Sequence, residues 1–149
     1  MTPTGQAGRS FLFYRPSPFD VKERAMDKLI WIALGGVLGA WSRYFMGLWA
    51  VEKWGSDFAV GTLMINIIGS FVMAWVLYLN ASRGVFSPNI RLFLTVGFCA
   101  TFTTFSTFSW DTLRYLSEGN FKYFAMNITF NVAGCLLGSW FGIMLAKLL

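Results

Sequence analysis

The sequence predicts an all-α membrane protein with four transmembrane helices, and three observations carry that prediction. Of its 149 residues, 56% are hydrophobic and only 13% are charged, and the mean hydropathy is +0.55. Soluble domains carry about 25% charged residues. Four apolar segments are each close to the roughly 20 residues that a helix needs to cross a bilayer. The connections between them are short, which leaves no room for a soluble domain.

The predicted spans follow a stretch of different composition. Residues 1–25 contain three prolines, small polar residues and mixed charge, and they lack the apolar core and cleavage site of a signal peptide. We expect a disordered leader here, or an upstream extension of a protein whose translation begins at Met26. Residues 26–149 then form one four-helix transmembrane domain. Its spans are predicted at about 29–49, 59–80, 89–115 and 121–146.

The composition also argues against an enzyme. The chain has no histidine, and both of its cysteines lie in apolar segments. The commonest general base and the usual metal ligands are therefore missing, and buried thiols mostly behave as small hydrophobic side chains. The net charge of +5 does not require a nucleic acid partner, because a few basic residues at helix ends produce the same balance.

The most unusual stretch is residues 97–111, in the middle of the third predicted span. It carries four Thr, two Ser and four Phe, although every polar group in hydrocarbon needs a partner. A single Ser or Thr usually bonds back to its own helix. Six hydroxyls among aromatic rings instead favour an ion or solute path. The Thr-rich run after Gly97 also predicts a break in this helix, which frees carbonyls at one half-helix end and amides at the other.

Polar residues on the other spans have two interpretations each. Asn66 shares a helix face with small residues, so it either bonds neighbouring helices together or lines a pore as a donor. Asn127 and Asn131 lie one turn apart on the glycine-rich face of the fourth span and could form a ladder of donors. Arg43 lies on the glycine stripe of the first span, either as a snorkelling anchor or as part of a positive vestibule that concentrates anions.

Positive charge is balanced across the predicted membrane. Counted from Met26, the side with the termini and the middle loop carries four Lys and Arg, and the opposite side also carries four. The positive-inside rule then gives no preferred orientation, so the chain is expected to insert both ways and to assemble as an antiparallel pair. Residues 1–25 add four more basic residues to the first side, so the topology depends on where translation starts.

Three motifs together resemble the Fluc (CrcB) family of fluoride channels, from about Met26 to the C-terminus. They are Gly35-Gly36-x2-Gly39-Ala40-x2-Arg43-Tyr44, Gly61-Thr62-Leu63-x2-Asn66-x2-Gly69-Ser70-Phe71, and Gly97-Phe98-Cys99 leading into Thr103-Thr104-Phe105-Ser106-Thr107-Phe108-Ser109. The resemblance implies a channel domain that passively exports fluoride across the bacterial inner membrane and so lowers fluoride toxicity. It further implies a dual-topology, antiparallel homodimer with two pores. A structural sodium ion at its centre would be held by the backbone carbonyls of Ala100 and Thr103.

The expected fluoride pathway combines polar donors, aromatic rings and charges near the ends. Its predicted residues are Arg43, Asn66, Phe105, Ser106, Phe108, Ser109, Asp111, Asn127 and Asn131. Fluoride is small and strongly hydrated, so a pore must replace its water with donors. Ring edges carry positive potential, so Phe105 and Phe108 could meet the anion edge-on, although such pairs more often only pack a core.

The chain departs from the family pattern at three places. Ala100-Thr101 replaces the usual Gly-Gly, Asp111 replaces the usual Glu, and Trp110 stands where a small residue is normal. The first departure concerns the implied sodium site, and the other two concern the vestibule of the pore.

Two other functions remain open from the residues alone. A small dual-topology, proton-coupled exporter would need an acidic residue within a span. Glu52, Asp57 and Glu118 are instead predicted in loops, and Asp111 near a helix end. A structural assembly subunit is the second alternative, in which every polar residue above only holds helices together.

Overall fold

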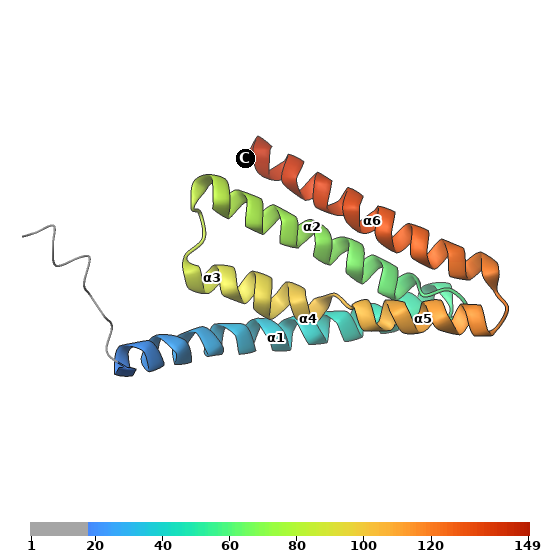
Figure 1. Cartoon of the computed structure of the whole chain (residues 1–149), viewed down its shortest axis with the longest axis horizontal. Coiled ribbons are helices and arrows are strands. Elements are labelled where there is room, and N and C mark those ends of the chain that lie inside the picture. Colours follow the sequence, from blue (N-terminus) through green and yellow to red (C-terminus); the bar gives the residue numbers. More distant parts are fainter. Residues whose placement is uncertain (1–17) are drawn as a thin grey trace, which may run out of the picture.

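The computed structural model describes residues 18–149, with side chains from Met26 onward. Every regular element in this range is helical: α1 (Pro18–Trp54), α2 (Val60–Arg83), α3 (Pro88–Leu92), the π-helical η2 (Phe93–Cys99), α4 (Ala100–Phe102), α5 (Phe105–Ser117) and α6 (Phe121–Leu148) (Figure 1). Four segments of the described chain are long and apolar enough to cross a membrane, namely Met26–Trp54, Val60–Arg83, Pro88–Ser117 and Phe121–Leu148. The predicted all-α, multi-pass architecture is confirmed at this level.

The leader predicted at residues 1–25 is only partly within the described range. Residues 18–25 form the N-terminal part of α1, which continues without interruption into the first span. The disorder predicted for the preceding seventeen residues falls outside the described part of the chain.

Glycines on α6 allow α2 and α6 to lie side by side and parallel (Figure 1). A Cβ atom added to Gly138 would lie 2.9 Å from the carbonyl oxygen of Ile67, and one added to Gly142 would meet the carbonyl oxygen of Phe71. Small residues at four-residue spacing permit such close approach between membrane helices. This pair forms the most extensive helix contact of the described chain.

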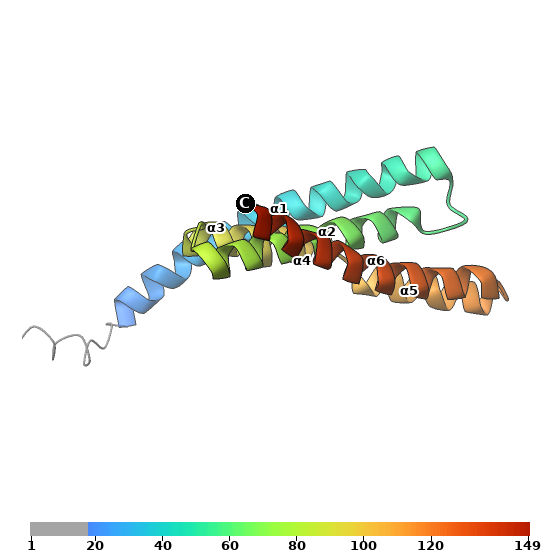
Figure 2. The same cartoon turned by 90° about the horizontal axis from the view of Figure 1, so that it is seen from above.

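A second close contact joins α1 to the first half of the third span. A Cβ atom added to Gly97 would lie 2.9 Å from the Cα atom of Gly35. Thr101, one of the departures from the family pattern, shares its hydroxyl hydrogen between the carbonyl oxygen of Gly97, one turn earlier at 2.7 Å, and that of Gly36 on α1 at 3.2 Å. The second half of the span, α5, packs instead against α6, and Figure 2 shows this pair lying apart from the end of α1.

The third span changes direction because its helix is interrupted at two residues. Thr103 (φ −77°, ψ 158°) and Thr104 (φ −149°, ψ 112°) have extended backbone between α4 and α5. Ala100 remains helical at φ −66°, and no non-glycine residue of the described chain has a positive φ. Replacing the family's glycines with Ala100 and Thr101 therefore causes no left-handed backbone strain in this arrangement.

Candidate functional site

Asn66 on α2 binds the interrupted backbone of the third span. The backbone amide of Thr104 donates to Asn66 Oδ1 at 2.8 Å, and Asn66 Nδ2 donates to the carbonyl oxygen of Thr104 at 3.1 Å. Thr104 also caps α5, because its Oγ1 accepts from the backbone amide of Thr107 at 3.1 Å. The amides of Thr104 and Thr107, which the interruption frees, thus find side-chain acceptors.

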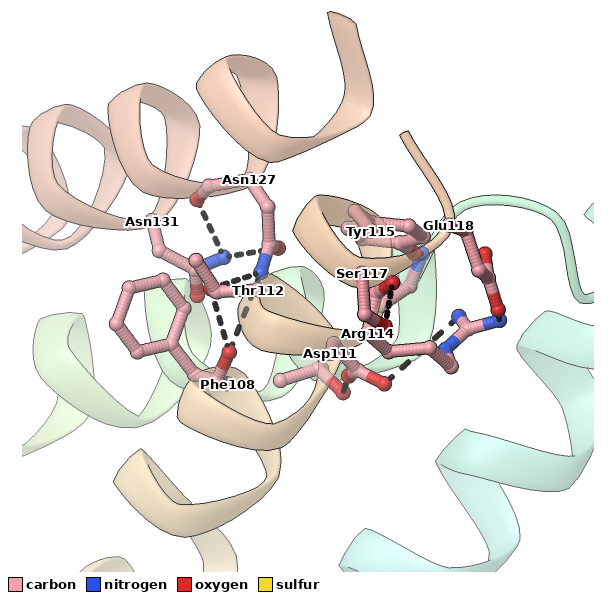
Figure 3. Close-up of polar contacts among 11 residues, drawn as sticks. Phe108, Asp111, Thr112, Arg114, Tyr115, Ser117, Glu118, Asn127 and Asn131 are labelled. Carbon is pink, nitrogen blue, oxygen red and sulfur yellow. Dashed lines mark hydrogen bonds and ion pairs between the residues drawn. The ribbon is translucent and has the colours of Figure 1, made fainter. Parts of the chain in front are cut away.

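A chain of asparagines continues from Asn66 across α6 and back to α5. Asn66 Nδ2 donates to Asn131 Oδ1 at 3.1 Å, and Asn131 Nδ2 donates to the backbone and side-chain oxygens of Asn127 at 3.0 Å each. Asn127 Nδ2 then donates to Thr112 Oγ1 at 2.8 Å and to the carbonyl oxygen of Phe108 at 3.3 Å (Figure 3). Each side-chain amide nitrogen has two acceptors, which is its full capacity.

The first cavity lies beside the interruption and has a volume of about 520 Å³. The rings of Phe105 and Phe108 line it, with their centroids 5.4 Å apart and their planes inclined by 50°. Phe105 is 78% exposed. The other residues with polar side chains or a thiol that line the same cavity are Asn66, Ser70, Thr103, Thr104, Asn131, Cys135 and Ser139.

Arg43 lines a second cavity, of about 420 Å³. The hydroxyl-bearing residues Thr62, Thr104 and Thr107 line this cavity with it. Among residues 26–149, Arg43 forms no ion pair. Thr104 lines both cavities, so both border the interruption in the third span.

Asp111 lies further along α5, in a cluster of charged and hydroxyl groups (Figure 3). Its Oδ2 accepts from Thr62 Oγ1 at 3.2 Å, and its Oδ1 lies 3.9 Å from a guanidinium nitrogen of Arg114. Arg114 also lies 3.7 Å from Glu118. Asp111, Thr62 and Thr107 line a third cavity of about 210 Å³, which shares Thr62 and Thr107 with the cavity of Arg43.

The two predicted serines bond locally on α5. Ser109 Oγ donates to the carbonyl oxygen of Phe105 at 2.9 Å, one turn earlier. Ser106 Oγ lies 3.2 Å from Thr104 Oγ1 at the helix cap. Neither serine lines the first cavity, whereas Phe105 and Phe108 do.

The structure therefore divides the predicted pathway residues among several places. Asn66, Phe105, Phe108 and Asn131 meet at the first cavity, and Asn127 lies behind them, with 0% of its surface exposed. Arg43 and Asp111 lie at the other two cavities.

Three threonines were not predicted as site residues. Thr104 lines the first and second cavities and caps α5. Thr62 and Thr107 line the second and third cavities. Thr104 was recognisable in principle, because Thr is a preferred N-cap residue after a helix interruption. Thr62 pairs with Asp111 across 49 positions of sequence, and no local pattern reports such a pairing.

The family resemblance implies that the backbone carbonyls of Ala100 and Thr103 are sodium ligands. The amide that would bond to the Ala100 carbonyl in a continuous helix belongs to Thr104, which donates to Asn66 instead. The corresponding amide for Thr103 belongs to Thr107, which donates to Thr104 Oγ1. Both carbonyls thus lose their usual helical donors. Hard cations take carbonyl oxygens as ligands, so the chemistry of these two carbonyls would suit a sodium ion.

These features define a small multi-pass membrane protein whose interrupted third span borders cavities lined by asparagine, threonine and phenylalanine side chains. A family model described as CrcB-like protein, Camphor Resistance (CrcB), matches residues 30–143. The chain belongs to this family, as its three motifs predicted.

Several relatives carry the name fluoride-specific ion channel FluC. The protein of Geotalea uraniireducens (strain Rf4) is 39% identical over 124 residues, which cover 83% of this chain and 100% of the relative. That of Citrifermentans bemidjiense is 37% identical over 124 residues, with 83% and 100% coverage. That of Koribacter versatilis (strain Ellin345) is 38% identical over 112 residues, with 75% of this chain and 89% of the relative covered.

Proposed function

We propose that this protein is a fluoride-selective channel that passively exports fluoride across the bacterial inner membrane and so lowers its toxicity. One observation carries the proposal: Phe105 and Phe108 line a single cavity with Asn66 at the interruption of the third span. The channel names of relatives at 37–39% identity support it. A passive channel also needs no coupled chemistry.

Fluoride passing this cavity would meet ring edges and polar donors in turn. The positive edges of Phe105 and Phe108 can face an anion where water is scarce. The amide hydrogens of Asn66 and Asn131 are paired within the protein, so the anion would have to compete for them. A passage that offers fixed donors and little room disfavours larger chloride. Arg43, in its own cavity, would raise the local anion concentration at one end.

We also propose that the working unit is an antiparallel, dual-topology homodimer. The face of α5 presents Phe105 at 78%, Trp110 at 70% and Leu113 at 62% exposure. Phe105 also lines the first cavity, so a second copy packed against α5 there would close the cavity and supply its other wall. In a single subunit, lipid would cover the same side chains. The balanced charge on the two membrane sides supports insertion in both orientations.

The sodium ion is proposed as a structural element of that dimer. The carbonyls of Ala100 and Thr103, together with those of the second copy, would surround it at the two-fold axis. Their ligand chemistry is independent of side-chain identity, so the departures at 100 and 101 do not exclude the site. The ion would join the two interrupted helices rather than cross the membrane.

Fluoride efflux from liposomes that contain only the purified full-length chain tests the proposed function. A fluoride electrode should record rapid efflux that stays unchanged when the pH gradient across the vesicle is abolished or reversed. Efflux that requires a proton gradient would favour the proton-coupled exporter instead. No efflux from correctly folded protein would favour a purely structural subunit.

A further inference from the structure

We infer that Asn127 is a positioning residue, which sets the orientation of the Phe108 ring through Thr112 rather than binding fluoride itself. The inference rests on the proposed channel function, because its consequence is a change in fluoride flux. It assigns to Asn127 a different part from the pathway donor that the sequence predicts. The contacts of Asn127, its burial and its absence from the cavity lining carry the argument.

Asn127 has no amide hydrogen left for an anion. Its Nδ2 donates to Thr112 Oγ1 at 2.8 Å and to the carbonyl oxygen of Phe108 at 3.3 Å. Its Oδ1 accepts from Asn131 Nδ2 at 3.0 Å. The residue is 0% exposed, and the first cavity is lined by Asn66 and Asn131 but not by Asn127. Asn66 and Asn131 are bonded as fully, but they line the cavity, so its complete burial away from the cavity sets Asn127 apart as a structural group.

The bonds of Asn127 converge on one turn of α5. Thr112 Oγ1 donates to the carbonyl oxygen of Phe108 at 2.7 Å, so three groups form a closed triangle (Figure 3). A threonine hydroxyl that bonds back to the preceding turn often bends a helix. The amide of Asn127 holds this hydroxyl from outside the helix, and therefore fixes α5 about its own axis at the level of Phe108.

A second attachment holds α5 at its beginning. Asn66 binds the backbone of Thr104 on both its donor and acceptor sides, at 2.8 and 3.1 Å. The two attachments are linked, because Asn131 bonds to Asn66 at 3.1 Å and to Asn127 at 3.0 Å. The half-helix that carries both phenylalanines is thus held at its first residue and again beyond Phe108. Loss of the second attachment would weaken the restraint on α5 at the level of Phe108, while the cap and the Thr62–Asp111 hydrogen bond remain.

Thr112→Val is the decisive variant, because it removes the hydroxyl while nearly keeping the side-chain shape. We expect fluoride efflux to fall about tenfold, the size expected from one buried hydrogen bond. Thr112→Ser retains the hydroxyl and should restore efflux to near that of wild type. Thr112 itself lines none of the cavities beside Phe108 or Arg43, so a pathway role for Thr112 does not explain such a loss.

A spectroscopic measurement separates orientation from general loss of stability. Full-length protein carrying 4-fluorophenylalanine only at position 108 should show a changed ¹⁹F chemical shift in Thr112→Val and the wild-type shift in Thr112→Ser. The same label at position 93, on the far side of the interruption, should not respond. Asn127→Asp, which keeps the acceptor oxygen but loses the donor, should change the 108 signal as Thr112→Val does.

Each contrary result overturns the inference. If Thr112→Val leaves both the 108 signal and the efflux unchanged, Asn127 does not act through this turn of α5. If the 93 signal shifts equally, the variant loosens the fold as a whole. Failure of the proposed function is recognised separately, since wild-type protein would then pass no fluoride whatever the ¹⁹F spectra report.

Discussion

The side chain of Asn66 and the backbone of Thr104 form a two-way hydrogen-bonded pair between α2 and the interrupted third span. The Thr104 amide donates to Asn66 Oδ1 at 2.8 Å, and Asn66 Nδ2 donates back to the Thr104 carbonyl at 3.1 Å. The pair replaces bonds that a continuous helix would have made within itself. One amide side chain therefore both stabilises the interruption and borders the cavity that contains the two phenylalanines.

Asn66→Asp should reduce fluoride efflux by about tenfold or more. An ionised aspartate keeps the acceptor for the Thr104 amide but places a carboxylate oxygen against the Thr104 carbonyl and against Asn131 Oδ1. It also adds negative charge beside an anion path. Fluoride-electrode measurements on reconstituted protein give the result.

Asn80→Asp is the matched control for this variant. Asn80 uses only its Oδ1, which accepts from the backbone amide of Phe86 at 3.1 Å, so an aspartate can replace it. Its efflux should equal that of wild type. Equal efflux in Asn66→Asp would assign Asn66 to helix packing alone.

Phe105→Ile and Phe108→Ile should each lower fluoride efflux strongly, by about tenfold, while the protein still assembles. Isoleucine keeps an apolar side chain but has no ring edge of positive potential. Size-exclusion chromatography checks assembly, and the electrode assay checks transport. Phe93→Ile, upstream of the interruption, is the control and should retain efflux. Normal efflux in both site variants would mean that the two rings only pack the protein.

Gly138→Ala should destabilise the protein by about 1–3 kcal/mol through overpacking. The new Cβ would lie 2.9 Å from the carbonyl oxygen of Ile67, which is backbone and cannot move aside cheaply. Gly47→Ala makes the same change within a helix, but no heavy atom lies within 4 Å of its Cβ. Thermal unfolding in detergent should separate the two variants, and equal stability would contradict the close α2–α6 contact.

The sequence predicts features that depend on local composition, and it does not predict which side chains of different spans make contact. Mean hydropathy and segment length report four spans directly, because a bilayer sets the length of an apolar helix. Of the pathway residues predicted from the motif around Phe105, the structure places the two phenylalanines at one cavity but neither Ser106 nor Ser109. Pairing between spans has no such local signal. Asn127 and Asn131 lie on the same predicted face, yet only Asn131 borders the cavity, because a neighbouring helix determines what each amide reaches.

One hydroxyl-bearing residue on α5 and one on α2 illustrate the same point. Ser109 bonds to its own helix at Phe105, whereas Thr62 on α2 reaches Asp111. Both residues carry a hydroxyl group within a predicted span. Their sequence contexts do not show which hydroxyl bonds within its own helix and which bonds to another helix. The direction in which α5 leaves the interruption decides which hydroxyl meets a neighbour.

The middle loop should be accessible from both sides of the membrane in protein that begins at Met26. A single cysteine at position 85, where Val85 is 57% exposed, can report this once Cys99 and Cys135 are replaced. Balanced charge predicts comparable labelling by a membrane-impermeant maleimide from each side. Labelling from one side only would contradict the antiparallel pair.

Residues 1–25 should also be dispensable for efflux, since the predicted spans begin after them, and loss of transport on their removal would assign them a function.

Sodium should stabilise the assembled protein without being transported. Replacing sodium with N-methylglucamine should lower the unfolding temperature of the reconstituted dimer, because four carbonyls at the axis would then repel one another. Fluoride efflux should not depend on the direction of an imposed sodium gradient. Ala100→Gly should keep the sodium dependence, since the proposed ligands are backbone oxygens and Ala100 already has an ordinary helical φ of −66°. Thr101→Gly is expected to weaken the protein for a separate reason, because it removes the hydrogen bond to Gly36 on α1. An unfolding temperature that is the same in sodium and in N-methylglucamine would defeat the sodium site, and the anion pathway at Phe105 and Phe108 would stand without it.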